Sequence, residues 1–325
     1  MLTSRKEQEM KKIIMKCVVF CTILLIILLI LSRLFVPKNN TRTAGIAKNK
    51  ALAMGVLAEP ENTIDALLIG DSESYTSFIP LEAWHEYGYT SYVCGTPAQK
   101  LSLTGTFIYD VLKKQSPKVI MIEMNTMYRR ASLVNPLEQV LMRMFPAIEY
   151  HNRWKKLTNE DFSGKVDYRY VQPDKGFYYS TKIESAKNEK YMKETETVKK
   201  VPRANRLYLK LIKDYCESKG IEVVLYSCPS IVNWDTERHN GIVKLAKELN
   251  LEYIDLNVEE SIKIDWEKDS RDEGDHLNFT GSLKTTRFLA EYLGTKNLPD
   301  HRSDKSYNSW NEYYKKYIDK VNKNK

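Results

Sequence analysis

Several short apolar runs that end abruptly in polar residues limit the folds open to this chain. The first run, 66–69, leads directly into Gly70, Asp71 and Ser72. Comparable runs lie at 89–94, 118–124, 221–226 and 252–256. Segments with helical spacing separate them, and continuous apolar runs are typical of parallel strands covered on both faces. This alternation predicts an α/β fold with a doubly wound parallel sheet of about five strands.

Polar or small residues at the ends of these runs should share one edge of the sheet. Ser72 follows the first predicted strand, Gly95 the second and Asn125 the third. The carboxyl ends of parallel strands meet at one edge, where open α/β sheets bind their ligands. We therefore expect these three residues to belong to one site.

The site predicted at this edge contains a serine and a histidine. A serine hydroxyl is a weak nucleophile at neutral pH and needs a base within hydrogen-bond reach. We predict Ser72 as the nucleophile and His276 as the base, because His276 stands beside a carboxylate cluster and before a helix. The backbone N–H groups of Ser72 and Gly95 and the side chain of Asn125 are the predicted donors to a developing oxyanion. The remaining histidines are expected at the surface: His85, His151, His239 and His301.

The carboxylate that orients His276 is left open by the sequence. Asp272, Glu273 and Asp275 all lie within four residues of it. Asp272 and Glu273 are the candidates, whereas Asp275 is directly adjacent and is expected to point elsewhere. Asn278, two residues after the histidine, is expected to cap the last helix of the domain, a common use of asparagine.

The segment 17–36 is apolar on all sides and about 20 residues long, which is the length needed to cross a hydrocarbon core. Five basic residues precede it, and no small-x-small cleavage site follows it. This pattern predicts an uncleaved signal anchor with a cytoplasmic N-terminus and an extracytoplasmic C-terminal domain in the cell membrane.

The chain divides into an anchor and one large domain. The predicted divisions are a cytoplasmic N-terminus at 1–12, a transmembrane anchor at 13–36, a stalk at 37–58, an α/β domain at 59–295 and a basic, tyrosine-rich tail at 296–325. A polar insertion at 132–202 interrupts the domain. It is expected to be a lid or a binding surface, or else a disordered or purely structural segment without a role in binding. The tail is expected to form an amphipathic helix, packed on the domain or lying near the membrane.

Charge and cysteine content exclude several other classes of protein. The formal net charge of +8 is moderate and its basic residues are scattered, so no nucleic-acid-binding stripe is present. The five cysteines form no Cys-x-x-Cys pair, which indicates neither a disulfide framework nor a zinc site. No metal or cofactor is expected.

These blocks resemble the SGNH/GDSL hydrolase superfamily over roughly residues 60–295. The matching residues are Gly70-Asp71-Ser72, Gly95, Asn125 and the sequence Asp275-His276-Leu277-Asn278. The sequences at 94–99 and 116–120 resemble those of one membrane-anchored branch of this superfamily. That branch includes DltD-type proteins and the SGNH partners of membrane-bound O-acyltransferases. The chain departs from the family at Glu273, where an aspartate is common, and around Asn125, which lacks the usual flanking residues.

The resemblance implies a flavodoxin-like three-layer fold and a serine-dependent acyl esterase or O-acyltransferase. Its branch implies a cell-surface polysaccharide or teichoic-acid-like polymer as substrate or acceptor. An alternative is a weakly active or inactive assembly partner of a membrane-bound O-acyltransferase. An ordinary lipase would be expected to carry an apolar lid, whereas the insertion here is polar and tyrosine-rich.

Overall fold

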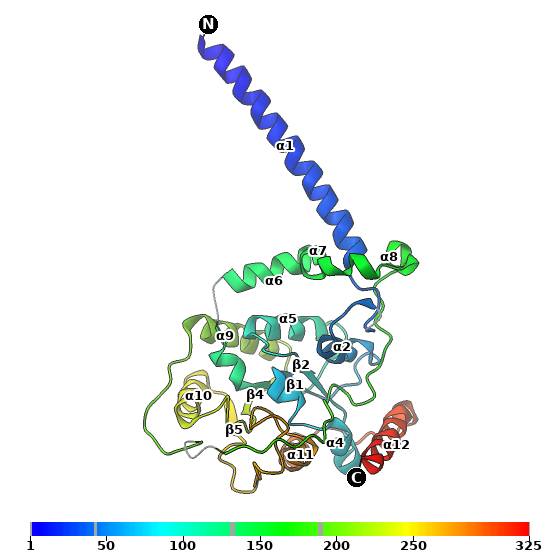
Figure 1. The fold of residues 1–325 in the computed structure, drawn as a ribbon, viewed down its shortest axis with the longest axis vertical. Coiled ribbons are helices and arrows are strands. Elements are labelled where there is room, and N and C mark those ends of the chain that lie inside the picture. Colours follow the sequence, from blue (N-terminus) through cyan, green and yellow to red (C-terminus); the bar gives the residue numbers. More distant parts are fainter. Residues whose placement is uncertain (1, 42–43, 131–133, 188–190, 325) are drawn as a thin grey trace.

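A five-stranded parallel sheet forms the centre of the computed structural model, which describes residues 2–41, 44–130, 134–187 and 191–324 (Figure 1). The strands are β1 (Ala66–Gly70), β2 (Ser91–Gly95), β3 (Val119–Glu123), β4 (Glu222–Ser227) and β5 (Glu252–Asp255). Their order is β2-β1-β3-β4-β5, and every neighbouring pair is parallel. The predicted fold class is confirmed, with the strand order of flavodoxin-like folds.

Helices cover both faces of the sheet. One face packs against α5 (Leu101–Val111), α9 (Arg203–Glu217) and α10 (Thr236–Leu249), and the other against α4 (Pro80–Tyr87) and α11 (Phe279–Gly294). Side chains alternate between the two faces along each strand, so Leu67 contributes to one core and Leu68 to the other. The connections change face where the strand order reverses, between β1 and β3, and such a switch point is where these sheets bind ligands.

The strand register brings the predicted site residues to one edge. Gly70 pairs with Gly95, so β1 and β2 end side by side. Ile69 pairs with Ile122, which places the end of β3 on the other flank of β1. Ser72 opens the short helix α3 (Ser72–Tyr75), and Asn125 lies in the 3-10 helix η3 (Met124–Tyr128).

The N-terminal helix α1 (Leu2–Phe35) extends away from the domain (Figure 1). Within it, Lys6–Phe35 is long and apolar enough to cross a membrane and is not buried in the domain. Signal sequences share this length and composition.

The segment expected to be a stalk packs on the domain, and Lys38, Asn40 and Ile46 are already buried in its first part. It forms α2 (Lys48–Met54) and the 3-10 turn η2 (Gly55–Ala58). Ala51 and Ala53 are buried, and the Tyr92 hydroxyl donates to the Leu52 carbonyl at 2.7 Å. These small alanines let the helix approach β2 closely, so an alanine-rich run here serves packing.

The C-terminal tail completes the core beside α4. It contains η5 (Lys305–Tyr307) and α12 (Asn308–Lys323). Trp310 and Tyr317 are buried, and the Tyr317 hydroxyl donates to Glu82 on α4 at 2.6 Å. The helix is therefore packed on the domain, as one of the two expectations had it.

The insertion has two separate parts. The first contains α6 (Val134–Met144), α7 (Pro146–Tyr150), η4 (His151–Lys156) and α8 (Asn159–Ser163), which lie across the foot of α1 in Figure 1. The second, residues 172–186, runs without helix or strand over the carboxyl edge of the sheet. We call this second part the strap.

Candidate active site

The turn after β1 presents Ser72 at the first position of α3. The Asp71 side chain caps this helix by accepting a hydrogen bond from the Glu73 backbone N–H at 3.1 Å. Gly70 has no room for a side chain, because a Cβ there would lie 2.3 Å from the Cβ of Glu123. The Gly-Asp-Ser sequence thus reflects one tight strand end, one cap and one serine at a helix start.

Gly95 lies against the same turn. A Cβ on Gly95 would lie 2.8 Å from the Asp71 carbonyl oxygen and 2.5 Å from Ser74 Oγ. Only glycine allows β2 to approach the turn this closely, and this proximity places the Gly95 backbone beside Ser72. Its predicted oxyanion role remains a prediction.

Asn125 is held by Asp71 and by an arginine, Arg238, that no sequence pattern had pointed to. Its Nδ2 donates to Asp71 Oδ2 at 3.0 Å, and its Oδ1 accepts from Arg238 at 3.1 Å. Arg129 also donates to Asp71 Oδ2, at 2.7 Å from Nε, and balances the charge of this fully buried aspartate. The amide Nδ2 carries a second hydrogen that the bond to Asp71 does not use. Asn125 therefore keeps one donor for a bound oxyanion.

His276 is held by Asp272 through both carboxylate oxygens. Asp272 Oδ2 lies 2.7 Å from the ring Nδ1, and Oδ1 accepts from the His276 backbone N–H at 2.7 Å. The other ring nitrogen, Nε2, is buried and has no hydrogen-bond partner among the described residues. This is the arrangement of a base whose tautomer is set on one side and whose second nitrogen is free to take a proton.

Electrostatics keep Asp272 ionised. Burial by itself would raise its pKa, but the hydrogen bonds and charge of His276 and the charge of Arg271 outweigh burial, so the pKa lies below its usual value. Arg271 Nε lies 3.2 Å from Asp272 Oδ2. An ionised Asp272 suits the stabilisation of a histidinium.

Glu273 is exposed, and the structure does not bring it to His276. Glu273 and Gly274 both have left-handed backbones, with φ of 56° and 88°. These two residues turn the chain back, so the residue four before the histidine meets the ring. Asp275, which was expected to point elsewhere, has Oδ2 only 3.5 Å from the same Nδ1.

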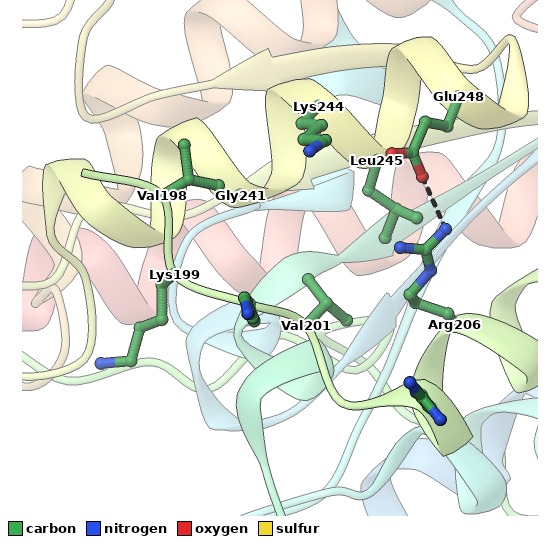
Figure 2. Close-up of a pocket in the computed structure, with 10 residues that line it drawn as sticks. Val198, Lys199, Val201, Arg206, Gly241, Lys244, Leu245 and Glu248 are labelled. Atoms are coloured by element: carbon green, nitrogen blue, oxygen red, sulfur yellow. Dashed lines mark hydrogen bonds and ion pairs between the residues drawn. The ribbon is translucent and has the colours of Figure 1, made fainter. Parts of the chain in front are cut away.

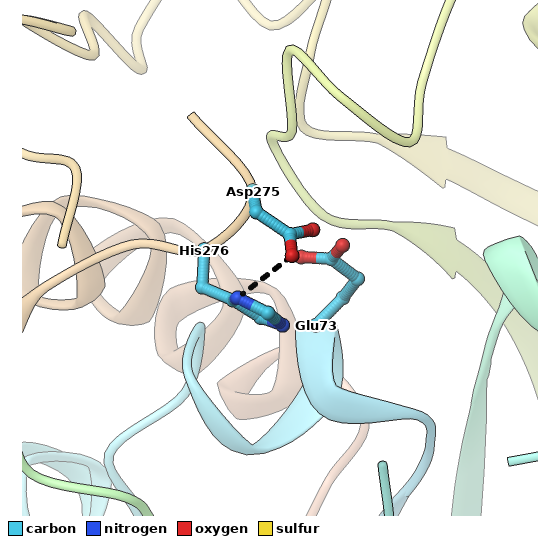
Figure 3. Close-up of side chains that lie close together, drawn as sticks. All are labelled: Glu73, Asp275 and His276. Carbon is cyan, nitrogen blue, oxygen red and sulfur yellow. Dashed lines mark ion pairs between the residues drawn. The ribbon is translucent and has the colours of Figure 1, made fainter. Parts of the chain in front are cut away.

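Glu73 forms a second acidic group beside the base. Glu73, Asp275 and His276 offer ligand atoms that lie within 4.8 Å of one another, with Glu73 coming from α3 and the other two from one loop (Figure 3). The donor types would suit a divalent cation. The Asn233 amide, however, donates to both carboxylates, at 2.6 Å to Glu73 Oε1, and occupies the position between them. Both carboxylates are therefore already partnered by Asn233.

Burial raises the pKa of Glu73 well above its usual value, and the charges of Asp71, Glu123 and Asp275 raise it further. Its second oxygen, Oε2, is buried without a hydrogen-bond partner among the described residues. The group is thus favoured in its neutral form. No local pattern distinguishes Glu73 beyond its place after the serine.

The strap ties the serine turn to the histidine loop. The backbone N–H of Tyr178 donates to the Tyr75 carbonyl at 2.8 Å, and that of Glu184 donates to Ser270 at 3.0 Å. The strap is anchored by Lys175, whose Nζ pairs with Glu59 at 2.8 Å in a fully buried ion pair. The strap therefore joins the turn that carries Ser72 to the loop that carries His276, although among the described residues no hydrogen bond links Ser72 to His276 Nε2.

Helix α11, which was predicted as the last helix of the α/β domain, begins where expected. The Asn278 side chain caps α11 by accepting from the backbone N–H groups of Thr280 and Gly281. This confirms the predicted cap and fixes where the loop carrying His276 ends.

Two of the histidines expected at the surface have acidic partners. His239 Nδ1 lies 2.6 Å from Asp255, and His301 Nε2 lies 3.0 Å from Asp65. Asp255 also accepts from the Trp234 indole at 2.9 Å. These contacts join α10 to β5 and the tail to β1, so they stabilise the fold.

A basic cavity of about 390 Å³ lies between α10 and the segment leading into α9 (Figure 2). Arg206 is paired across it with Glu248 at 2.6 Å. The other charged residues around it are all basic: Lys199, Lys200, Arg203 and Lys244. Neither Ser72 nor His276 lines this cavity, so it is separate from the candidate active site.

Comparison with known proteins gives likenesses of fold alone. No family model matches the chain, and no curated protein sequence matches it significantly. A GDSL-like lipase from Bacteroides thetaiotaomicron is 10% identical with a TM-score of 0.39, over 77% of this chain and 98% of that one. The lipase/acylhydrolase from Enterococcus faecalis is 10% identical with a TM-score of 0.39, over 73% and 98%. The psychrotrophic esterase EstA from Pseudoalteromonas is 9% identical with a TM-score of 0.37, over 71% and 97%. Such likenesses assign no activity, which has to be argued from the site.

Proposed function

We propose that this chain is a membrane-anchored acyl ester hydrolase or O-acyltransferase of the SGNH/GDSL type that acts outside the cytoplasm. The observation that carries the proposal is the His276 ring, held by Asp272 at 2.7 Å with its Nε2 unpaired within the described part of the chain. Ser72 stands at the start of the adjoining short helix α3.

The first half of the proposed reaction forms an acyl-enzyme. His276 Nε2 takes the proton of Ser72 as Oγ attacks the acyl carbonyl, and the carbonyl electrons move onto its oxygen. The backbone N–H groups of Ser72 and Gly95 and the free hydrogen of Asn125 Nδ2 stabilise this oxyanion. The tetrahedral intermediate then expels the alcohol, which leaves with the proton from His276.

The second half transfers the acyl group. His276 removes a proton from water or from a sugar or polyol hydroxyl, which attacks the acyl-Ser72 carbonyl. Collapse of the second intermediate returns the proton to Ser72 Oγ and releases an acid or a new ester. Asp272 stabilises the histidinium in both halves.

The proposed substrate is a cell-surface polysaccharide or a teichoic-acid-like polymer. The basic cavity in Figure 2 supports an anionic polymer among these, since its lysines and arginines attract phosphate or carboxylate groups. The apolar helix α1 supports a single-pass anchor with the domain outside the membrane.

A second candidate is an assembly partner of a membrane-bound O-acyltransferase with little turnover of its own. The observation that favours it is that Ser72 and His276 are each only 8% exposed. In this case a partner would have to open the site or to use the domain only for docking.

The experiment compares the detergent-solubilised full chain with Ser72→Ala and His276→Ala, using a fluorophosphonate probe and a chromogenic acetyl ester. His151→Ala, which changes an exposed histidine, is the matched control. We expect both activities in the wild type and the control and a loss on the order of 10³-fold or more in the two variants. A folded wild type that neither reacts with the probe nor cleaves the ester would overturn the enzyme proposal and leave the partner role.

A further inference from the structure

The first part of the insertion exposes large apolar side chains. Trp154 is 61% exposed and Phe162 is 67% exposed, and α6 and α7 carry Val140, which lines a cavity against α5 and α9, and three other exposed apolar side chains. Those three are Leu141, Met144 and Ile148. We call these five residues the apolar face. Large apolar side chains exposed together on one segment are typical of a surface that binds a partner or a membrane.

The apolar face of α6 is turned away from the domain. Val140 and Arg143 line a cavity against α5 and α9, and Arg143 is paired with Asp110 of α5. Because each residue of a helix is rotated by about 100° from the last, Leu141 projects to a different side from this pair. One side of α6 thus contacts the domain, and the side carrying Leu141 remains uncovered by the described residues.

The same segment is fixed to the end of α1. The Ala147 backbone N–H on α7 donates to Ser32 Oγ at 3.4 Å. Arg153, which is buried, donates to the Phe35 carbonyl and pairs with Asp161 of α8 at 2.8 Å. Figure 1 shows α6, α7 and α8 lying across the foot of α1. The apolar face is therefore held where a membrane-spanning α1 would leave the bilayer.

The charges around the face match a lipid surface. Lys155 and Lys156 are exposed next to Trp154, and Lys155 Nζ lies 5.1 Å from the Trp154 ring centroid. Tryptophan rings sit at the level of lipid headgroups, and lysines extend from there to the phosphates. Apolar side chains beside lysines are the composition of interfacial helices.

We propose that residues 134–163 form an interfacial platform that lies in the outer surface of the bilayer, with the apolar face immersed and Lys155 and Lys156 on anionic headgroups. This inference rests on the proposed membrane anchor and is independent of the ester chemistry. The platform fixes the domain against the membrane at a second point, so α1 is not a flexible tether.

The test uses the full chain reconstituted into vesicles of phosphatidylcholine and phosphatidylglycerol, with and without bromine on the upper acyl carbons. Subtracting the emission of Trp154→Phe from that of the wild type isolates Trp154. Trp266→Phe isolates the matched control residue, which lies in the loop between β5 and α11. We expect bromine to reduce Trp154 emission by about twofold or more, since an interfacial ring contacts the upper acyl carbons, and to leave Trp266 unchanged.

Alkaline carbonate extraction separates failure of the anchor from failure of the platform. A chain that carbonate removes from the vesicles lacks the anchor, and the platform proposal falls with it. A chain that stays in the vesicles with Trp154 unquenched by bromine and open to aqueous iodide retains the anchor but overturns the platform. The exposed face would then be free for a protein partner.

Discussion

Asp272 binds His276 twice, through Oδ2 to the ring Nδ1 and through Oδ1 to the backbone N–H, each at 2.7 Å. This double contact fixes both the position and the tautomer of the ring. The neighbouring Glu273 is exposed and makes no such contact. The two acids that the sequence offered are therefore expected to differ sharply in function.

Asp272→Asn should lower kcat/KM for ester cleavage by on the order of 10³–10⁴, because an amide nitrogen facing Nδ1 favours the wrong tautomer. Glu273→Gln, its matched control, should stay within about twofold of the wild type. Steady-state kinetics on the detergent-solubilised chain distinguish them. The reverse ranking would mean that the loop rearranges when substrate binds and that Glu273 takes over as the acid.

Gly95→Ala should impair catalysis more than folding. Its Cβ would press on the Asp71 carbonyl and Ser74 Oγ, which displaces an oxyanion donor and should lower kcat by on the order of 10². We expect a stability loss of about 1–3 kcal/mol. Gly105→Ala, inside α5 and against Ile212, is the control and should leave kcat unchanged. Unchanged kcat in Gly95→Ala would exclude a close role for β2.

Glu73→Gln should change how stability depends on pH. Burial, and then the neighbouring carboxylates, raise the pKa of Glu73, so the folded state keeps a proton that the unfolded state releases above about pH 4.5. Wild-type stability therefore falls as pH rises from there through the raised pKa. The variant, neutral at every pH, should match the wild type near pH 4 and exceed its Tm at pH 8. Thermal unfolding measures this, with the exposed Glu196→Gln as the control; a pH-independent difference would contradict the assignment.

Lys175→Met should destabilise the domain strongly. It leaves Glu59 buried and unpaired, which costs about 3–5 kcal/mol. Glu59→Gln combined with Lys175→Met removes both charges and should recover much of that loss. Lys210→Met, which breaks an exposed ion pair with Asp214, should cost less than about 1 kcal/mol. Urea unfolding of these variants and of the single variant Glu59→Gln gives the values, and strictly additive single-variant losses would argue against a coupled pair.

Lys200→Glu with Lys244→Glu should weaken binding to dextran sulfate by about tenfold at low salt, since both lysines line the basic cavity. Binding to uncharged dextran should not change. Lys315→Glu with Lys316→Glu, on exposed positions of α12, makes the same change in net charge and is the control. Equal weakening by the control would show that attraction comes from overall charge and not from the cavity.

The sheet could be predicted because its information is local. Each strand is a continuous apolar run, and the residues at the ends of β1, β2 and β3 follow from parallel register. The packing of α12 also had a local signal, since Trp310, Tyr317 and Val321 recur at helical spacing. The packing of α2 could not be predicted, because an alanine-rich segment has the same sequence pattern whether its helix is free or packed.

Other features depend on contacts between distant segments. Arg129, at the end of η3, contacts Asp71, and Arg238, on α10, contacts Asn125. No local sequence pattern predicts either contact. The choice of Asp272 depends on Glu273 adopting a left-handed backbone, which non-glycine residues seldom do. The strap carries no periodicity, so its contacts with both halves of the site appear only in three dimensions.

If α1 spans the membrane as proposed, the stacked helix layers set the distance between the bilayer and Ser72. With α1 in the membrane, α6 rests on α5, and α5 rests on the sheet that ends at Ser72. Two helix diameters of about 10 Å each keep the serine on the order of 20 Å above the lipid headgroups. An acyl chain that remains embedded in the bilayer cannot span that gap. With the proposed anchor and function, the acyl group would arrive on a carrier that projects from the membrane, or would already be attached to a polymer that passes at the height of the sheet.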